Sequence, residues 1–203
     1  MKNFQNTGVR NLLPEGGEAF YFGKILEEKE ADDFFKQLYD KVEWTQDEVI
    51  IFGKRIVTKR ETAWYGATDF DYTYSKITRK ARLWLPELVS LRDLVKDITG
   101  YEFNSCLLNL YHSGEEGMSW HSDAEAELGK DPVIASLSLG AERKFVLKNK
   151  ISKEKVSVVL EPGSLLLMQG ETQKNWLHSL PKTKKVHEPR INLTFREIKK
   201  IRK

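Results

Sequence analysis

Two side chains that can bind a metal ion, His121 and Asp123, lie two positions apart in this sequence. In an extended segment residues i and i+2 point to the same side, so the imidazole and the carboxylate can reach one ion together. A third ligand must come from another histidine, and of His112, His178 and His187, His178 follows a predicted strand. Two histidines and one carboxylate form a facial triad, which leaves coordination positions open and suits Fe(II) that must also bind a co-substrate and O₂. Taken alone, a His-x-Asp tripeptide is more often an ordinary surface or hydrogen-bonded pair.

A second pattern that could bind a ligand is the strand-like segment 189–196, which has an apolar face and a polar face. Arginine pairs bidentately with carboxylates and keeps its charge, so the polar face could bind a small dicarboxylate. The two arginines are about 20 Å apart along a strand, so both must lean toward such a ligand. A second strand-like segment, 108–111, carries Asn109 and Tyr111 on one face, and both can also hydrogen-bond a carboxylate. The alternative for both segments is a solvated strand face. The polar face consists of Arg190, Asn192, Thr194 and Arg196.

Two amphipathic helices are expected before these segments. Residues 27–42 carry apolar side chains on one helical face, and a second helix runs from about Pro86 to Ile98. Proline suits the first turn of this helix and Gly100 suits its end. The first 25 residues look irregular, apart from a short apolar run from Ala19 to Phe22.

After Gly100 the pattern changes to short β-like runs separated by turn signals. Helices followed by many short strands indicate an α+β protein with a closed or two-layer β core. We expect these strands at about 103–112, 132–139, 143–149, 155–160, 164–168 and 190–197.

The composition is that of an ordinary globular protein, with 203 residues, 40% hydrophobic and 31% charged. This length favours one domain over two. A single cysteine, Cys106, excludes an intrachain disulfide framework and a multi-thiolate metal site. No apolar run approaches the roughly 18 residues of a membrane span, and the first residues lack an apolar signal core. We therefore expect an intracellular protein, cytoplasmic if bacterial and nuclear if eukaryotic.

Basic residues gather in three clusters, although the formal net charge is only +3. Each cluster is either solvated surface or a region that attracts phosphate groups. Charge alone does not decide between these two interpretations. The clusters are 79–82, 182–185 and 199–203.

Read together, these segments resemble the AlkB family of Fe(II)- and 2-oxoglutarate-dependent nucleic-acid demethylases. The resemblance covers about residues 48–198 and rests on several motifs in the expected order. They are Asn109-Leu110-Tyr111, His121-Ser122-Asp123, the strand Pro132 to Gly140, Trp176 to Pro181, and Arg190 to Arg196.

This resemblance implies a double-stranded β-helix, or jelly-roll, core in a single domain over residues 1–203. Helices and nucleotide-recognition segments would occupy about residues 1–100, and the catalytic core about residues 101–198. The resemblance implies that His121, Asp123 and His178 bind the iron. It also places five residues at 2-oxoglutarate: Arg190, Asn192 and Tyr111 at its distal carboxylate, and Arg196 and Asn109 near its 1-carboxylate.

The chain looks most like the DNA-repair branch of the family. Trp64-Tyr65-Gly66 and Tyr72-Thr73-Tyr74-Ser75 are similar to that branch's nucleotide-recognition segment. By this similarity Tyr74 would stack on a flipped base opposite His121, Tyr72 would hydrogen-bond nearby, and Glu125 would contact the exocyclic group of the base. The family often has a second acidic residue where this chain has Ala124, which leaves base selectivity open. The alternative for both tyrosines is an ordinary core or surface aromatic.

Two further residues would contact the nucleic acid. Phe52, in a segment similar to a finger hairpin, would fill the gap left by the flipped base. Arg60 falls where the family places an arginine that contacts a phosphate or a strand. The alternative for Phe52 is a core phenylalanine.

The resemblance thus implies oxidative demethylation of N-alkylated bases in DNA, such as 1-methyladenine and 3-methylcytosine. Fe(II) would be the cofactor, with 2-oxoglutarate and O₂ as co-substrates. The partner would be single- or double-stranded DNA, or RNA, with no membrane, and the protein would be a monomer. Alternatives are an RNA demethylase, an oxygenase for a protein or small molecule, and a non-catalytic nucleic-acid-binding module.

Overall fold

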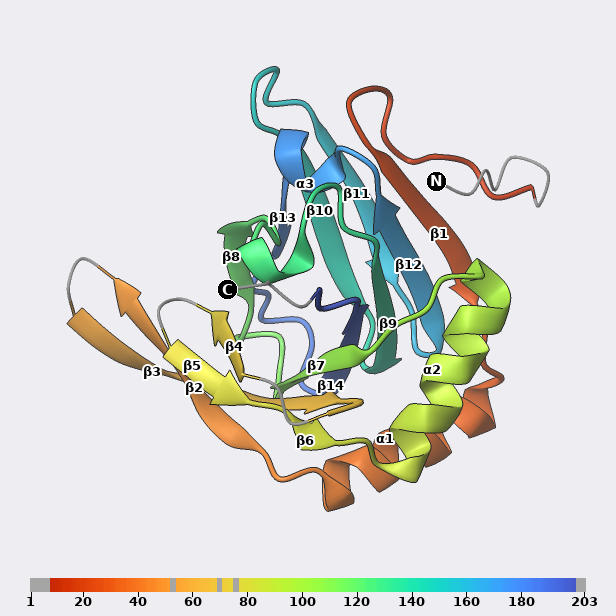
Figure 1. Cartoon of the computed structure of the whole chain (residues 1–203), viewed down its shortest axis with the longest axis vertical. Helices are drawn as coiled ribbons and strands as arrows, with labels where there is room; N and C mark the ends of the chain where they lie inside the picture. Colours follow the sequence, from red (N-terminus) through yellow and green to blue (C-terminus); the bar gives the residue numbers. More distant parts are fainter. Residues whose placement is uncertain (1–7, 52–53, 69–70, 75–76, 200–203) are drawn as a thin grey trace.

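The computed structural model describes residues 8–51, 54–68, 71–74 and 77–199. Within these ranges, residues 47–51, 54–56, 71–74 and 77–79 are described by their backbone alone. The described part folds into two antiparallel sheets, a separate hairpin and two long helices, as Figure 1 shows. No helix in this part of the chain is long and apolar enough to span a membrane.

The larger sheet has eight strands in the described part of the chain, in the order β1-β12-β9-β14-β7-β3-β2, with β6 paired to β3. All its neighbours are antiparallel except β3 and β6. Its strands are β1 (Glu18–Lys24), β2 (Thr45–Ile51), β3 (Lys54–Gly66), β6 (Arg82–Leu83), β7 (Ser105–Tyr111), β9 (Ile134–Gly140), β12 (Ser164–Gln169) and β14 (Arg190–Arg196).

The smaller sheet has the strand order β11-β10-β13-β8, and the hairpin consists of β4 and β5. Two antiparallel sheets that enclose a site between them agree with the predicted jelly-roll core. The strands are β8 (Met118–His121), β10 (Arg143–Asn149), β11 (Lys155–Leu160), β13 (Trp176–Leu180), β4 (Asp71–Tyr74) and β5 (Ile77–Lys80).

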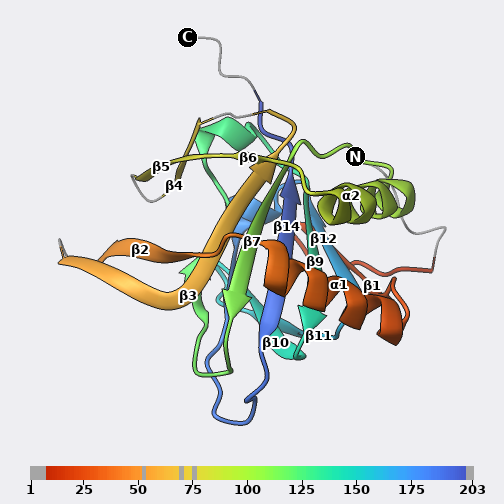
Figure 2. The same cartoon turned by 90° about the horizontal axis from the view of Figure 1, so that it is seen from below.

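Helices α1 (Glu28–Lys41) and α2 (Pro86–Thr99) cover the outer face of the larger sheet, as Figure 2 shows. The backbone N–H of Glu27 donates to Glu30 at the start of α1. Gly100 ends α2 with φ 67°, a left-handed conformation that favours glycine. Both helices lie where the sequence predicted them.

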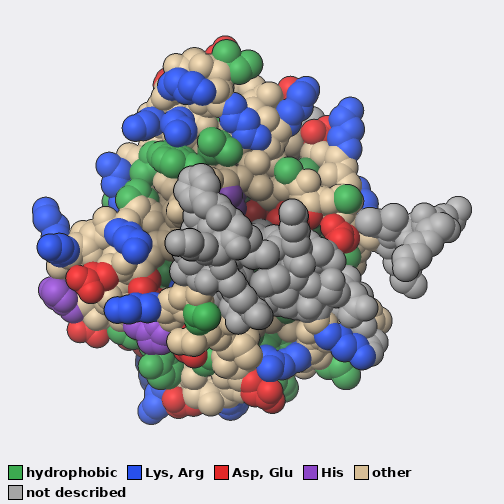
Figure 3. Space-filling model, turned by 90° about the vertical axis from the view of Figure 1, so that its left-hand side faces the viewer, with side chains coloured by type: hydrophobic (Ala, Val, Ile, Leu, Met, Phe, Trp, Pro, Cys, Tyr) green, Lys and Arg blue, Asp and Glu red, His purple; other side chains and the backbone are tan. Residues whose placement is uncertain are grey.

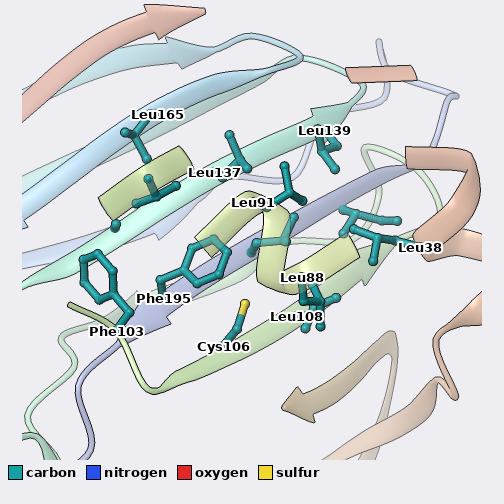
Figure 4. Packing of buried hydrophobic residues seen from close by; sticks show 14 of the residues in the cluster. Leu38, Leu88, Leu91, Phe103, Cys106, Leu108, Leu137, Leu139, Leu165 and Phe195 are labelled. Carbon is teal, nitrogen blue, oxygen red and sulfur yellow. The ribbon is translucent and has the colours of Figure 1, made fainter. Parts of the chain in front are cut away.

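The main hydrophobic core fills the space between these helices and the sheet (Figure 4). Leu38 of α1 and Leu88 and Leu91 of α2 meet Leu108 of β7, and all four are fully buried. Burying each of these side chains contributes roughly 1.5–3 kcal/mol. This core uses one face of the larger sheet, which leaves the other face free for the interior between the sheets.

The structure differs from the sequence prediction in three places. Residues 18–24, expected to be irregular, form β1, which pairs with β12 despite a register shift between Tyr21 and Gly23. His178, expected after a strand, lies within β13, where it pairs with His121 of β8 and lines the cavity. Strands β1, β2 and β3, all before residue 100, belong to the larger sheet. The expected boundary near residue 100, between recognition segments and the catalytic core, therefore does not divide the sheet.

Candidate metal centre and dicarboxylate pocket

A cavity lies between the inner faces of the two sheets. It encloses about 830 Å³, part of it open to solvent. Strands β3, β7, β9, β12 and β14 line it from the larger sheet, and β8, β10 and β13 line it from the smaller sheet. Its polar lining residues are Arg60, Thr62, Asn109, Tyr111, His121, Asp123, Ser136, His178, Arg190, Asn192, Thr194 and Arg196.

His121, Asp123 and His178 converge in this cavity. Oδ1 of Asp123 lies 3.8 Å from Nε2 of His121 and 4.0 Å from Nε2 of His178. One ligand atom from each of the three residues lies within 4.8 Å of the others. His121 ends β8 and faces His178 across the pairing of β8 with β13. These three residues could therefore hold one metal ion.

The protonation states of this cluster suit metal binding. Burial alone would raise the pKa of the Asp123 carboxyl, but Arg196 and the two imidazoles outweigh it and lower that pKa to about 2. Burial, and then the neighbouring His121, lowers the pKa of His178 to about 3. Nδ1 of His121 lies 2.8 Å from the carbonyl oxygen of Ser119. A proton on that nitrogen leaves Nε2 free to coordinate, as is usual for histidine ligands.

Arg190 lies in the cavity as a buried cation. Nη2 of Arg190 donates to Oγ of Ser138 at 2.9 Å and to Oδ1 of Asn192 at 2.6 Å. The Tyr111 ring lies 5.6 Å from its guanidinium carbon. Burial lowers the pKa of Arg190 to about 10, so it stays charged near pH 7. Among the described residues no carboxylate pairs with Arg190, and its buried Nε has no hydrogen-bond partner.

Arg196 lies beside the metal cluster. Its Nη2 donates to Oδ2 of Asp123 at 2.7 Å, and both side chains are buried. Asn109 also lines the cavity, and its Oδ1 is buried without a hydrogen-bond partner among the described residues. Both arginines of the predicted polar strand face therefore point into one cavity, while Ile191, Leu193 and Phe195 pack under the helices.

Arg60 is 5% exposed and also lines the cavity. Its Nη1 donates to Sδ of Met118 at 3.0 Å. The sequence had indicated a contact with a phosphate or a strand, and the structure places this cation inside the cavity wall.

The other predicted recognition residues are less completely described. Phe52 and Ser75 lie outside the described residues, and Tyr72 and Tyr74 are described only as backbone of β4. Glu125 is partly buried and precedes the short 3₁₀ helix Ala126–Leu128. The described residues that line the cavity do not include Glu125.

Sequence reasoning missed several residues of the site. Ser136 and Ser138 on β9 hydrogen-bond Asn192 and Arg190, and their alternation with leucines was a period-two signal. Trp64 lines the cavity beside Arg196, although the sequence placed it in a recognition segment. Gln173 hydrogen-bonds the backbone of Asp123, and no sequence pattern marks it.

Cys106 takes no part in the cavity. It is fully buried in the main hydrophobic core, and burial raises the pKa of its thiol. Cys106 therefore packs in the core, away from the cavity.

Comparison with known proteins finds a family model and several curated relatives. A model of the 2OG-Fe(II) oxygenase superfamily matches residues 18–196. Over 199 residues the chain is 41% identical to the human alpha-ketoglutarate-dependent dioxygenase alkB homolog 3, covering 93% of this chain and 69% of that protein. The bovine alkB homolog 3 is 43% identical over 180 residues, which cover 84% of this chain and 62% of that protein.

A second group of relatives carries a different name. The human DNA oxidative demethylase ALKBH2 is 41% identical over 203 residues, covering 93% of this chain and 76% of that protein. Among solved structures, OsALKBH1 superposes with a TM-score of 0.65 at 19% identity, covering 91% of this chain and 99% of that one. At that identity the likeness supports the fold alone.

Proposed function

Because this chain belongs to the 2OG-Fe(II) oxygenase superfamily, and within it to the AlkB family, we propose that it is a dioxygenase that demethylates alkylated nucleic-acid bases. Fe(II), 2-oxoglutarate and O₂ supply the oxidising chemistry: 2-oxoglutarate becomes succinate and CO₂, and the N-methyl group is hydroxylated and leaves as formaldehyde. The protein's own residues bind and orient the reactants and shield the site from water.

The observation that carries this proposal is the cluster of His121, Asp123 and His178. Two imidazole nitrogens and one carboxylate oxygen form the donor set of non-haem Fe(II) oxygenases, which leaves positions open for co-substrates. The carboxyl is ionised and His178 is unprotonated near neutral pH, as ligands must be. The residues present therefore fit Fe(II), and these three would hold it.

The buried cation Arg190 fits the distal carboxylate of 2-oxoglutarate. In the described part of the chain this arginine is shielded from water and paired with neutral groups, so an anion would offset its desolvation. Asn192 and Tyr111 lie beside it and complete this end of the pocket. Arg196 lies beside the metal cluster, where the oxo-acid end would bind, and Asn109, which lines the same cavity, would contact that end as well.

We assign base recognition to the segment of β4 and to Glu125, as the family resemblance implies. Tyr74 would stack on the flipped base opposite His121, Tyr72 and Glu125 would contact its edge, and Ser75 would follow in the same segment. Arg60, already in the cavity wall, would meet the nucleotide there rather than at the outer surface.

The hairpin of β2 and β3 supports the proposed apolar wedge. These strands pair as far as Ile51 and Lys54, and Phe52 follows directly in sequence. Figure 3 views this side of the molecule, where many Lys and Arg side chains lie among fewer Asp and Glu side chains. Cations on this face would attract nucleic-acid phosphates.

The test uses purified protein with Fe(II), 2-oxoglutarate, ascorbate and air. Its substrates are matched single-stranded DNA, duplex DNA and RNA oligonucleotides, each carrying one 1-methyladenine, and mass spectrometry follows the loss of the methyl group. Loss that depends on 2-oxoglutarate is expected on DNA. Succinate formation without loss from any strand would refute nucleic-acid demethylation, and a preference for RNA would favour the RNA demethylase.

The same assay tests the wedge. Phe52→Ala should reduce repair of the duplex more than repair of the single strand, because only the duplex leaves a gap in a base stack. Equal loss on both substrates would contradict this role. The monomeric state stays a prediction, which light scattering on the purified chain would check.

A further inference from the structure

The segment that carries two of the proposed iron ligands is held by a residue far along the chain. Oε1 of Gln173 accepts a hydrogen bond from the backbone N–H of Asp123 at 2.9 Å. Strand β8 ends at His121, so the chain has left the sheet when it reaches Asp123. Both Asp123 and Gln173 are almost fully buried, at 2% and 3% exposed. A buried N–H beyond the end of a strand needs an acceptor, and Gln173 supplies it.

Gln173 belongs to the short helix α3 (Thr172–Asn175), and Lys150 ties this helix to the same segment. Nζ of Lys150 donates to the carbonyl oxygen of Gln173 at 2.8 Å and to Oγ of Ser122 at 3.2 Å. Ser122 lies between the two ligands. Two independent contacts from α3 and its neighbour therefore fix this short stretch of backbone.

The other side of α3 is anchored by the loop before β1, and Figure 1 shows α3 beside that loop. Nδ2 of Asn175 donates to the carbonyl oxygen of Gly16 at 2.9 Å, and the backbone N–H of Glu18 donates to Oγ1 of Thr172 at 2.8 Å. A Cβ on Gly17 would come within 3.0 Å of Cα of Thr172, so this close approach requires glycine. Because α3 is fixed on this side, Gln173 offers a rigid acceptor.

The direction of the Asp123 carboxylate depends on this support. Its Oδ1 faces Nε2 of both His121 and His178, while its Oδ2 accepts a hydrogen bond from Arg196. A change in the backbone at this position would turn Oδ1 away from the two imidazoles. Partners that orient metal ligands typically contribute ten- to a hundredfold to metal affinity, in order of magnitude.

We propose that Gln173 is a positioning residue for Asp123, which sets the carboxylate for metal binding without touching metal or substrate. The described residues that line the cavity do not include Gln173, so it acts through the backbone of Asp123. This inference rests on the proposed function, since it takes Asp123 as an iron ligand.

A matched pair of variants of the full chain separates positioning from stability. Gln173→Met keeps the size of the side chain and removes the acceptor. Gln169→Met removes a glutamine that is fully buried four residues earlier and bonded to Tyr101 and Glu18, away from Asp123. We expect Gln173→Met to weaken Co(II) binding by about ten- to a hundredfold, measured by absorbance titration. Gln169→Met should lower stability yet bind Co(II) like the wild type.

The second readout needs no metal. Hydrogen exchange at the Asp123 amide of the metal-free protein should be faster in Gln173→Met, and Gln173→Glu should restore protection because its carboxyl oxygen also accepts. The inference is wrong if Gln173→Met binds Co(II) like the wild type, or if Gln169→Met weakens binding equally. Failure of the wild type itself to bind Co(II) would instead overturn the proposed metal site, so the two failures are distinguishable.

Discussion

Replacing Arg190 with methionine removes the cation proposed to bind the distal carboxylate of 2-oxoglutarate. The side chain is 2% exposed, and its hydrogen-bond partners among the described residues are the neutral groups of Ser138 and Asn192. Methionine fills a similar elongated space without a charge. The variant should therefore lose affinity for 2-oxoglutarate and keep its fold.

The size of this effect follows from the burial of the site. A hydrogen bond to a charged group contributes about 1.5–3 kcal/mol, and a bidentate contact in a water-excluded pocket lies at the upper end. A loss of about 3 kcal/mol corresponds to roughly a hundredfold rise in the dissociation constant. Without ligand the wild type carries an uncompensated buried cation, so the free energy of unfolding of metal-free Arg190→Met should stay level or rise.

Two measurements check this prediction. Succinate formation gives the KM for 2-oxoglutarate, and calorimetric titration of the Mn(II)-loaded protein under anaerobic conditions gives the binding constant without turnover. Arg143→Met is the matched control, because this equally buried arginine donates to backbone carbonyls, including those of Glu116 and Pro181, and reaches the pocket only through the Tyr111 ring, 5.9 Å from its guanidinium carbon. The control should lose about 2–4 kcal/mol of stability through orphaned carbonyls while its KM changes little.

Two results would contradict the proposed role of Arg190. A rise in the dissociation constant of Arg190→Met below about threefold, or about 0.7 kcal/mol, would show that the carboxylate binds elsewhere. A large loss of stability in Arg190→Met without 2-oxoglutarate would show that Arg190 mainly supports the fold.

Three further predictions concern other residues of the site and core. Asp123→Asn keeps the shape of the side chain and an oxygen acceptor for Arg196, but it loses the ionised metal ligand. Succinate formation that depends on 2-oxoglutarate should therefore fall by at least about a hundredfold in a folded protein. Turnover at the wild-type rate would contradict the ligand assignment. The pKa of His178 is lowered to about 3 by burial, so between about pH 3 and pH 6.5 the unfolded chain binds a proton that the folded chain does not. The free energy of unfolding of the metal-free protein should therefore fall as pH falls through this window, by up to about 1.4 kcal/mol per unit from this residue. Urea unfolding of His178→Phe between pH 5 and pH 7 should show a shallower dependence, and an unchanged slope would exclude His178 as the cause. Cys106→Ala should cost about 1–2 kcal/mol in urea unfolding and leave succinate formation per folded molecule unchanged, whereas lost turnover would point to a role in catalysis.

The sequence predicted the helices and strands that bury one face, because their apolar side chains recur with the period of that element. The helices at 27–42 and 86–98 each bury one stripe against the larger sheet, so their apolar spacing was a direct signal. Strand β14 separates its apolar face from its polar face, and the alternation indicated both before the partners of either face were known.

Elements that depend on distant partners gave weak signals. Strand β1 lies at the edge of the larger sheet, and its pairing with β12 depends on residues more than a hundred positions away. Strand β13 mixes apolar side chains with His178 and Ser179, and only its His178 and Leu180 line the cavity. Neither pattern could be assigned to a strand without its neighbours.

The sequence by itself determined which side chains could do the chemistry: two histidines and an aspartate for a metal, and two arginines for a dicarboxylate. Local spacing and side-chain type carry that information for His121, Asp123 and the two arginines, and the family resemblance of the surrounding motif added His178. Only the tertiary structure decided that these groups share one cavity, that Arg190 is buried without a carboxylate partner among the described residues, and that Gln173 holds Asp123. These features arise from the pairing of strands far apart in the chain, which no local pattern encodes.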